Sequence, residues 1–441
     1  MLIDQLITDL ERAPPWTQHG RVTGVLGMMA EISGIERALS IGDRVTLQAR
    51  DRTVPCEVVG FRGGKALAMP FGVLDGIGLG ARAVVAAAAP VIFPDASWLG
   101  RTLDALGEEI DGRGPLYAGD KPYPIRHAPP PAHKRNRVAG KIDLGVRGLN
   151  QFLTCCKGQR MGIFSGSGVG KSVLLSMIAR YTSADVTVIG LIGERGREVQ
   201  EFIHDNLGDE GLKRSILVVA TSDQPPLLRR QAALITLTIA EFFRDQGKDV
   251  LCLIDSVTRF AMAQREIGLS AGEPPASKGY TPTVFAELPK LLERAGPNVG
   301  PGSITGLFTV LVEGDDHNEP VSDAVRGILD GHIVLDRAIA ERGRYPAVNI
   351  LRSISRTMPA CNSEAENAVV GRARQLLAAY EDMAEMIRLG AYRTGTDPRT
   401  DESIRYYPLL EGFLTQRSEE RADLASGYEQ LAQILASGGA A

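Results

Sequence analysis

The sequence predicts an α/β protein: a small N-terminal β-barrel, a central domain built on a mostly parallel sheet, and a helical C-terminal domain. Three observations carry this prediction. Short β-rich runs broken by glycines occupy residues 21–93, and apolar runs alternate with helical patterns between residues 159 and 356. After Cys361 the strand-like runs stop and helical periodicity takes over. Alternation of strands and helices is typical of a sheet covered by helices.

Length and composition narrow the possible functions. The chain has 441 residues, 44% of them hydrophobic, and 49 basic against 53 acidic residues give a net charge of −4. No basic surface for nucleic acid is indicated. No apolar run approaches the roughly 20 residues that span a bilayer, and a start containing Asp4 and Asp9 does not fit a secretion signal. We expect a cytosolic protein without a nucleic-acid partner, whose five cysteines are reduced structural thiols.

Residues 1–20 are expected to form a partner-docking helix. Apolar side chains between Ile3 and Leu10 recur at helical spacing before Pro14 and Pro15 end the pattern. Because a short isolated helix is only marginally stable, docking on another protein is favoured. Packing against the next domain of the same chain stays an alternative.

The barrel and the linker after it follow from local composition. Runs 44–47, 54–59 and 83–87 within residues 21–93 are β-rich and are separated by glycines, which is typical of a small barrel. Residues 94–141 are rich in proline, glycine and charge, and are expected to be a linker that lies on the next domain. We assign this linker and the central domain together to residues 94–360.

The central sheet is predicted from five apolar runs, and the helical C-terminal domain is assigned to residues 361–441. The predicted strands are residues 161–164, 186–192, 215–220, 250–254 and 304–311. In the last part, Leu424, Tyr428, Leu431 and Leu435 share one face of a helix.

A phosphate-binding loop is expected at residues 165–172, which read Ser-Gly-Ser-Gly-Val-Gly-Lys-Ser between a strand-like run and an apolar helical segment. Glycines let successive N–H groups face one anion, and the helix that follows presents its positive dipole end. Lys171 can reach the outer phosphates and Ser172 can bind Mg²⁺. Ser165 replaces the usual first glycine, so a flexible loop with a chance Gly-Lys-Ser stays an alternative. The expected ligand contacts are Gly166, Ser167, Gly168, Val169, Gly170, Lys171, Ser172 and Val173.

Two carboxylates follow predicted strands and should meet this loop at the carboxyl edge of the sheet. Asp255 suits a role in holding Mg²⁺ through water beside Ser172, although a strand-end cap is the alternative. Glu194 suits a general base, a role that contributes about 10²- to 10⁴-fold in rate. Its alternative is a surface ion pair with Arg195 or Arg197.

Several other segments of the sequence, together with the phosphate loop, resemble a known protein family. The chain resembles the catalytic subunits of the rotary ATP synthase superfamily, specifically the flagellar and type III protein-export branch. The resemblance implies a RecA-like P-loop domain at the centre of the fold. The matching stretches are residues 99–101, 111–115, 145–147, 190–199, 255–260, 272–280 and 302–305.

The resemblance also implies roles for residues that spacing alone does not single out. Arg195 and Arg259 match arginines near the γ-phosphate, and Arg356 matches an arginine finger that acts on the nucleotide of the adjacent subunit. Tyr345 and Phe413 match the aromatic residues that sandwich adenine. A site shared in this way implies a homo-oligomeric ring, most simply a hexamer.

The resemblance implies an enzyme that hydrolyses Mg-ATP to energise protein export through the flagellar type III apparatus. The implied location is the cytoplasmic face of the inner membrane, at the export apparatus. The implied partners are a regulatory stator-like protein at the N-terminal helix, a central stalk protein at residues 313–317, the export gate, export chaperones and cargo.

Four alternatives remain at this point. An injectisome that secretes virulence proteins uses the same machine. An ATP synthase catalytic subunit would carry a strongly acidic turn where residues 389–398 stand, and a hexameric helicase would show a basic, aromatic-rich barrel. A noncatalytic nucleotide binder would bind ATP without turnover.

Overall fold

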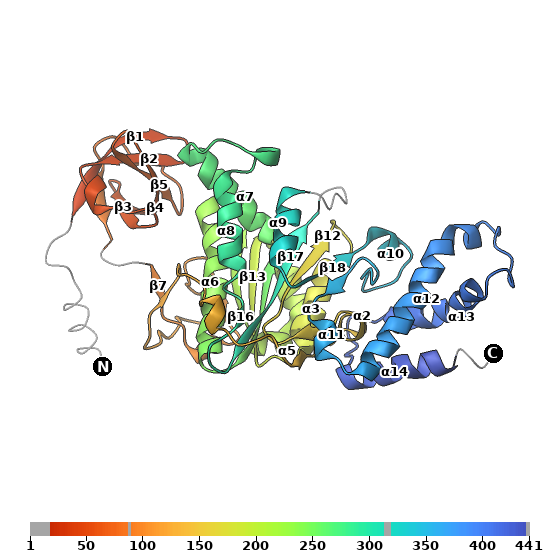
Figure 1. The fold of residues 1–441 in the computed structure, drawn as a ribbon. Coiled ribbons are helices and arrows are strands. Elements are labelled where there is room, and N and C mark those ends of the chain that lie inside the picture. Colours follow the sequence, from red (N-terminus) through yellow and green to blue (C-terminus); the bar gives the residue numbers. More distant parts are fainter. Residues whose placement is uncertain (1–17, 87–89, 313–318, 438–441) are drawn as a thin grey trace.

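The protein has three parts in a row, a barrel, a central sheet domain and a group of C-terminal helices (Figure 1). The computed structural model describes residues 18–86, 90–312 and 319–437. The expected docking helix and the expected stalk-facing loop at residues 313–317 therefore lie outside the described residues, apart from residues 18–20. No helix in the described ranges has the length and apolar character needed to cross a membrane.

The predicted N-terminal barrel is present and closed. Its strands hydrogen-bond in the order β1-β2-β5-β4-β3-β6, and alternate side chains such as Val45 and Leu47 are buried inside it. The strands are β1 (His19–Leu26), β2 (Met29–Ser33), β3 (Arg44–Gln48), β4 (Thr53–Arg62), β5 (Lys65–Pro70) and β6 (Arg82–Val85).

Buried charge ties the barrel to the central domain. Glu57 on β4 is only 3% exposed, and its Oε1 accepts a 2.6 Å hydrogen bond from Nη2 of Arg230 and lies 2.9 Å from Nη2 of Arg126. Beside this cluster Met69 of β5 packs in a small apolar cluster with Leu227. The joint therefore combines a small apolar cluster with a buried carboxylate that is balanced by two guanidinium groups.

The linker contributes to the domain it covers, which the sequence analysis did not anticipate. Strand β8 (Thr102–Leu103) adds a parallel edge strand to the central sheet, and β7 (Val91–Ile92) pairs with β9 (Tyr123–Pro124). His127 Nε2 donates a 2.7 Å hydrogen bond to Oε2 of Glu241, and the Arg294 guanidinium donates to the same oxygen at 2.7 Å. These contacts fix the linker in place.

The central sheet has the predicted parallel core. The described residues form nine strands in the order β19-β18-β12-β17-β15-β13-β14-β8, with β16 paired to β17, and only β16 and β19 run antiparallel. The five predicted runs are all strands, whereas the short β16, β18 and β19 were not predicted individually. The strands are β12 (Arg160–Ser165), β13 (Val186–Glu194), β14 (Ser215–Thr221), β15 (Asp249–Asp255), β16 (Gly296–Pro297), β17 (Ser303–Leu311), β18 (Gly331–Leu335) and β19 (Ile354–Ser355).

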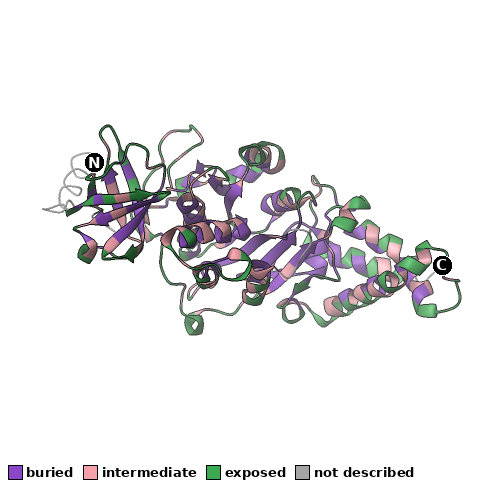
Figure 2. Cartoon of the chain, turned by 90° about the horizontal axis from the view of Figure 1, so that it is seen from above, coloured by how far each residue is buried: buried purple, intermediate pink, exposed green. Residues whose placement is uncertain are grey.

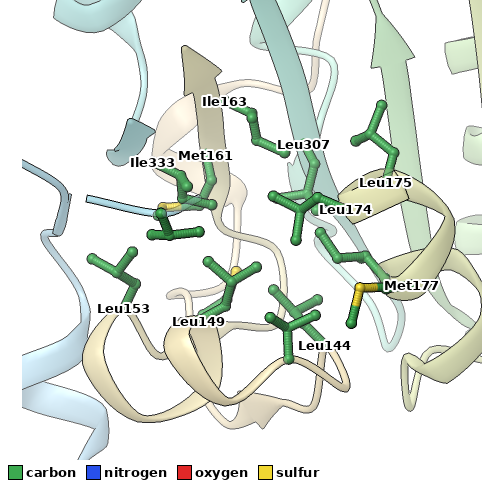
Figure 3. Close-up of a cluster of buried hydrophobic side chains, with 14 of the residues drawn as sticks. Leu144, Leu149, Leu153, Met161, Ile163, Leu174, Leu175, Met177, Leu307 and Ile333 are labelled. Atoms are coloured by element: carbon green, nitrogen blue, oxygen red, sulfur yellow. The ribbon is translucent and has the colours of Figure 1, made fainter. Parts of the chain in front are cut away.

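Each face of the sheet has its own hydrophobic core, because successive side chains of a strand point to opposite faces. On β13, Val188 and Ile192 belong to one core, whereas Ile189 and Leu191 belong to the other. Figure 2 shows the buried strands of the centre flanked by helices with exposed outer faces. In Figure 3 side chains of β12, of the loop–helix segment 144–153 and of the helix after the phosphate loop meet in the second core.

The helices cover both faces, and those of the C-terminal part share the second core with the sheet. The longest, α12, begins at a capping box between Ser363 and Glu366 and packs against α13, where Tyr380 stacks on Tyr407 with ring centroids 3.5 Å apart. The helices are α2 (Arg147–Phe152), α3 (Lys171–Tyr181), α4 (Gly196–Glu201), α5 (Gly208–Lys213), α6 (Pro226–Asp245), α7 (Val257–Ala271), α8 (Pro282–Leu292), α9 (Pro320–Ile328), α10 (Arg337–Glu341), α11 (Met358–Cys361), α12 (Glu364–Arg388), α13 (Pro398–Leu414) and α14 (Leu424–Ser437), with a π-helical turn at Phe202–Leu207.

The buried position of Glu57 predicts a large effect of its removal on stability. Glu57→Ala leaves Arg230 buried without its carboxylate, so the free energy of unfolding should fall by about 3 to 5 kcal/mol. Urea unfolding followed by circular dichroism measures the change. Glu31→Ala is the matched control, because Glu31 also holds two cations, Lys65 and Arg62, but at the surface, and should change little. Equal effects of the two substitutions would contradict the assignment.

Candidate functional site

The phosphate loop takes the shape that its glycines permit. It leaves β12 at Ser165 and ends at Gly170, which precedes the first residue of α3 and has a φ of 84°. Gly168 has a φ of 77°, also in the left-handed region that side chains disfavour. A Cβ on Gly170 would in addition lie 3.3 Å from the ring of Tyr345. The N-terminal end of α3 therefore opens onto the loop without obstruction.

Two further strands end beside Lys171 and supply carboxylates to it. Lys171 Nζ lies 2.5 Å from Oδ1 of Asp255, the last residue of β15, and 3.3 Å from Oε1 of Glu194, the last residue of β13. All three side chains are at most 14% exposed. The structure thus places one cation between the two carboxylates. All three groups lie at the carboxyl edge of the sheet, where we expected them because they follow the ends of parallel strands.

The charges at this edge shift the proton affinities of these groups. Burial, and after it the nearby charge of Asp255, raise the pKa of the Glu194 carboxyl to about 7, against the opposing charge of Lys171. Burial alone would lower the pKa of the Lys171 ammonium, but the two carboxylates outweigh it and raise that pKa. A carboxylate whose pKa lies near 7 suits general base catalysis at neutral pH.

Asp255 is oriented by a threonine that was not predicted from the sequence. The hydroxyl of Thr309, on the adjacent strand β17, donates a 2.7 Å hydrogen bond to Asp255 Oδ1, and Thr309 is fully buried. The same Oδ1 binds Lys171. Because one oxygen has both partners, the carboxylate is held in a single orientation. The second oxygen, Oδ2, is not part of these two contacts.

A cavity of about 550 Å³ covers the loop and the end of β13, while Asp255 lies behind Lys171 and is not among the lining residues. Arg259 of α7 lines it, as expected, and Arg195 reaches its rim with a side chain that is 82% exposed and 4.0 Å from Glu198. Arg337 of α10 donates a 3.2 Å hydrogen bond to the Ser167 carbonyl and so braces the loop. Other lining residues that were not predicted are Glu198, Ser222, Thr258, Met262, Leu311 and Val312.

Sequence signals existed for some of these additional residues. Ser222 follows β14, which was among the predicted strands, and Arg337 lies two residues after β18, which was not. The rule that selected Asp255 could therefore have found Ser222 directly, and Arg337 once β18 was included. Thr309 lies inside a buried strand, where nothing in the sequence separates a bonded threonine from a packed one.

The cavity fits a triphosphate and a magnesium ion. Nε of Arg259 and Oγ of Ser165 are buried and have no hydrogen-bond partner among the described residues, so two polar groups at the cavity wall are available to a ligand. The exposed hydroxyl of Ser172 and the carboxylate of Asp255 supply oxygen donors, which Mg²⁺ prefers.

A second cavity of about 420 Å³ adjoins the loop and contains only one of the two aromatic residues expected there. Tyr345 lines it with Gly170, Val173 and residues 415–419. Phe413 is not among its lining residues. It is 6% exposed and lies in the core, where its ring centroid is 6.4 Å from that of Phe152. The structure therefore brings Tyr345, but not Phe413, to the space beside the loop.

Arg356 lies far from the cavity of its own chain. Ser165, where the loop begins, pairs with Leu335 at one end of β18, whereas Ser355 pairs with Gly331 at the other end. Four residue steps of a strand cover about 13 Å. Arg356 comes directly after Ser355, is exposed and lies beyond that far end. Its strand runs away from the phosphate loop, so its guanidinium cannot reach the loop of its own chain.

Fold and site together define a P-loop ATPase with a RecA-like core. Comparisons with known proteins show to which family of ATPases the chain belongs. Residues 145–355 match the ATP synthase alpha/beta family, nucleotide-binding domain, and residues 362–433 match the T3SS EscN ATPase C-terminal domain. The chain belongs to the flagellar and type III secretion branch of the ATP synthase alpha/beta family, and it is an ATPase of that branch.

The individual relatives cover almost the whole chain. A flagellum-specific ATP synthase of Caulobacter vibrioides is 58% identical, with 98% of this chain and 99% of the relative covered. A type 3 secretion system ATPase of Xanthomonas euvesicatoria is 45% identical over 95% of this chain and 94% of its own. The structure of the assembled ATPase EscN of enteropathogenic E. coli covers 94% of this chain and 100% of its own, at 38% identity and a TM-score of 0.88.

The raised pKa of Glu194 makes stability without nucleotide depend on pH. The folded state keeps the proton to about pH 7 and the unfolded state loses it near 4.5, so stability from this group falls as pH rises between these values. Glu194→Gln removes the titration. The difference in unfolding free energy between the variant and the parent should therefore increase by roughly 1 to 3 kcal/mol as the pH rises from 5 to 8.

Urea unfolding of both proteins at several pH values measures this difference. Glu201→Gln is the control, because it makes the same substitution at a surface ion pair with Arg197. A constant difference between Glu194→Gln and the parent across the range would show that Glu194 titrates normally.

Proposed function

We propose that the protein hydrolyses Mg-ATP to energise protein export through the flagellar type III apparatus, and that it acts as a homo-oligomeric ring. One observation supports the chemistry above all: Glu194, Lys171 and Asp255 meet at the phosphate loop, and the carboxylate of Glu194 has its pKa near 7. The flagellar assignment rests on the relative at 58% identity, which is named flagellum-specific.

Each residue contributes a separate step. The N–H groups of residues 166–172 bind the β- and γ-phosphates. Lys171 leaves Glu194 and Asp255 and neutralises charge on the phosphates. Glu194, once freed from Lys171, accepts a proton from a water molecule. This water attacks in line with the bond that breaks. Mg²⁺, held by Ser172 and through water by Asp255, would neutralise charge on the phosphates. Arg259 and Arg195 line the same cavity and would contact the γ-phosphate.

The position of Arg356 supports a shared active site. It cannot serve its own phosphate loop, because it lies beyond the opposite end of β18. In a head-to-tail ring the finger of one subunit can enter the cavity of the next. Such a finger contributes about 10³- to 10⁵-fold in rate. EscN has been solved both assembled and with its central stalk EscO, and the latter structure has a TM-score of 0.86 to this chain.

The remaining assignments follow from the same branch. We propose a central stalk partner, a stator-like partner for residues 1–20, and contacts of the C-terminal helices with the export gate, chaperones and cargo. The protein would work at the cytoplasmic side of the inner membrane. Tyr345 would stack on adenine, and the cavity beside it is bounded by Arg417 and Ser418 in place of a second aromatic residue.

Mixing two inactive variants tests the shared site directly. Glu194→Gln and Arg356→Ala should each lower Mg-ATP turnover at least about 10²-fold. In a random one-to-one mixture, about a quarter of the interfaces join an intact Glu194 to an intact Arg356. Turnover of the mixture should therefore rise to as much as about a quarter of the parent's value.

Two further measurements complete this test. Turnover per parent chain should rise with protein concentration as rings form. Arg352→Ala is the matched control, because Arg352 is an exposed arginine of the same segment and contacts Asp336 at 3.8 Å, so its loss should leave turnover intact. Full activity of Arg356→Ala, or no recovery in mixtures whose mixed assemblies are verified by cross-linking, would exclude the finger.

A further inference from the structure

A short segment of the linker contacts both the barrel and the sheet domain. Ile125 is buried in the apolar core on one face of the sheet. Nη2 of the next residue, Arg126, lies 2.9 Å from Oε1 of Glu57 in the barrel. His127 then binds Glu241 of α6 at 2.7 Å. Because these three residues are consecutive, whatever holds His127 in place also helps to hold Arg126 against the barrel.

Both ring nitrogens of His127 face oxygen atoms that accept hydrogen bonds and cannot donate them. Nε2 lies 2.7 Å from the carboxylate of Glu241, and Nδ1 lies 2.9 Å from the carbonyl oxygen of Ala128. A neutral imidazole has a single N–H, so one of its nitrogens would turn a lone pair toward an oxygen. The imidazolium has two N–H groups and satisfies both contacts. The geometry of the segment is thus that of a protonated histidine.

Glu241 stays ionised whatever the charge of His127. Glu241 and Arg294 are both buried, and Arg294 donates to the two carboxylate oxygens at 2.9 and 2.7 Å. Burial raises the pKa of the Glu241 carboxyl, but Arg294 and then His127 outweigh it and lower that pKa to about 2. Arg294 also lies 3.4 Å from Nε2 of His127, where its positive charge opposes that of the imidazolium. Of these three groups, it is therefore His127 that changes charge near neutral pH.

The hydrogen bond to Glu241 fixes the direction of the pH dependence. It is the main reason that the pKa of His127 is raised above 6.5, against the effects of burial and of Arg294. The His127 side chain is 30% exposed, so its proton can exchange with solvent. The stability that this bond provides is fully present below pH 6.5. It is lost as the pH rises through the higher pKa of the folded protein.

Other ionisable groups near this site have partners or stay neutral. Arg244 and Asp245 of α6 pair with each other at 2.8 Å, and the hydroxyl of Tyr123 donates to Asp245 at 3.5 Å. Burial raises the pKa of Tyr123 and raises that of the Cys252 thiol to about 12. Both groups are therefore neutral in the range where His127 titrates.

We propose that His127 is a pH-sensitive latch, whose imidazolium fastens residues 125–127 to α6 and whose deprotonation releases this segment and loosens the contact of Arg126 with the barrel. When the proton leaves to solvent, one ring nitrogen turns a lone pair toward its acceptor oxygen, and that hydrogen bond is lost. Arg126 is 35% exposed and can then leave Glu57. Arg230 still holds Glu57 from α6 at 2.6 Å, so the joint loosens without coming apart.

Two measurements on the full-length protein without nucleotide test the latch. Deuterium exchange of the histidine ring C–H, followed by mass spectrometry, gives the pKa of His127, which should lie above 6.5. Amide hydrogen exchange, corrected for the intrinsic effect of pH, gives the protection of residues 119–128. This protection should fall at least about threefold as His127 loses its proton.

Variants separate the latch from a general effect of pH. In His127→Gln, which cannot titrate, the protection of residues 119–128 should not depend on pH. His133→Gln is the matched control, because His133 is an exposed histidine of the same linker, and this variant should behave like the parent. The latch is excluded by a pKa of His127 at or below 6.5, by protection that does not change with pH in the parent, or by an equal change in His127→Gln.

The connection to the barrel has its own readout. Arg126→Ala removes the contact with Glu57, so it should lower the free energy of unfolding more at about pH 6 than above the measured pKa of His127, where the latch is already open. In the His127→Gln background the effect of Arg126→Ala should not depend on pH. Urea unfolding measures both effects. An equal effect of Arg126→Ala at both pH values in the parent would show that the latch does not act on the barrel. Neither readout uses ATP turnover, so the test stands apart from the proposed function.

Discussion

The site depends on the contact of one ammonium group with two carboxylates. Lys171 neutralises Asp255 and Glu194, which lie too close together and too deeply buried to be stable as bare anions. The same contact requires that β12, β13 and β15 end at one level, so the register of the parallel sheet and the position of the phosphate loop are specified together. In the proposed mechanism, phosphate draws Lys171 away and releases the carboxylates for catalysis. An interaction that stabilises the free protein would thus become the source of its reactivity.

Much of this arrangement was predictable because it obeys rules of sequence. Glycine spacing marks the loop, apolar runs mark the strands, and the carboxyl ends of parallel strands gather Lys171, Glu194 and Asp255. What escaped prediction has no periodic signal. Strand β19 has two residues, and its antiparallel direction, which decides where Arg356 stands, follows from tertiary packing alone. Thr309 is similar, because a buried hydroxyl and a buried methyl look alike in a strand. Phe413 is the reverse case, because it was predicted from the family resemblance. In the structure it packs against Phe152 and does not line the cavity beside the phosphate loop.

The attachment of the C-terminal helices differs from that of the barrel. The apolar core on one face of the sheet continues without interruption from α3 through α2 into α12, α13 and α14. Polar contacts reinforce it, because Arg180 and Tyr181 at the end of α3 both donate to the Ser418 carbonyl. We therefore propose that the boundary near residue 361 separates two structural units without separating two cores. The barrel, in contrast, contacts the sheet domain through Glu57 and a small apolar cluster.

The different strengths of these two joints have a mechanical consequence. A close-packed interior has low compressibility and transmits displacement, so a shift of α3 caused by events at its first residue, Lys171, reaches the far helices as a rigid-body movement. The joint to the barrel consists of an ion cluster and a small apolar cluster, so we expect it to transmit displacement less completely. A movement that begins at the nucleotide site should therefore reach the C-terminal helices more than the barrel.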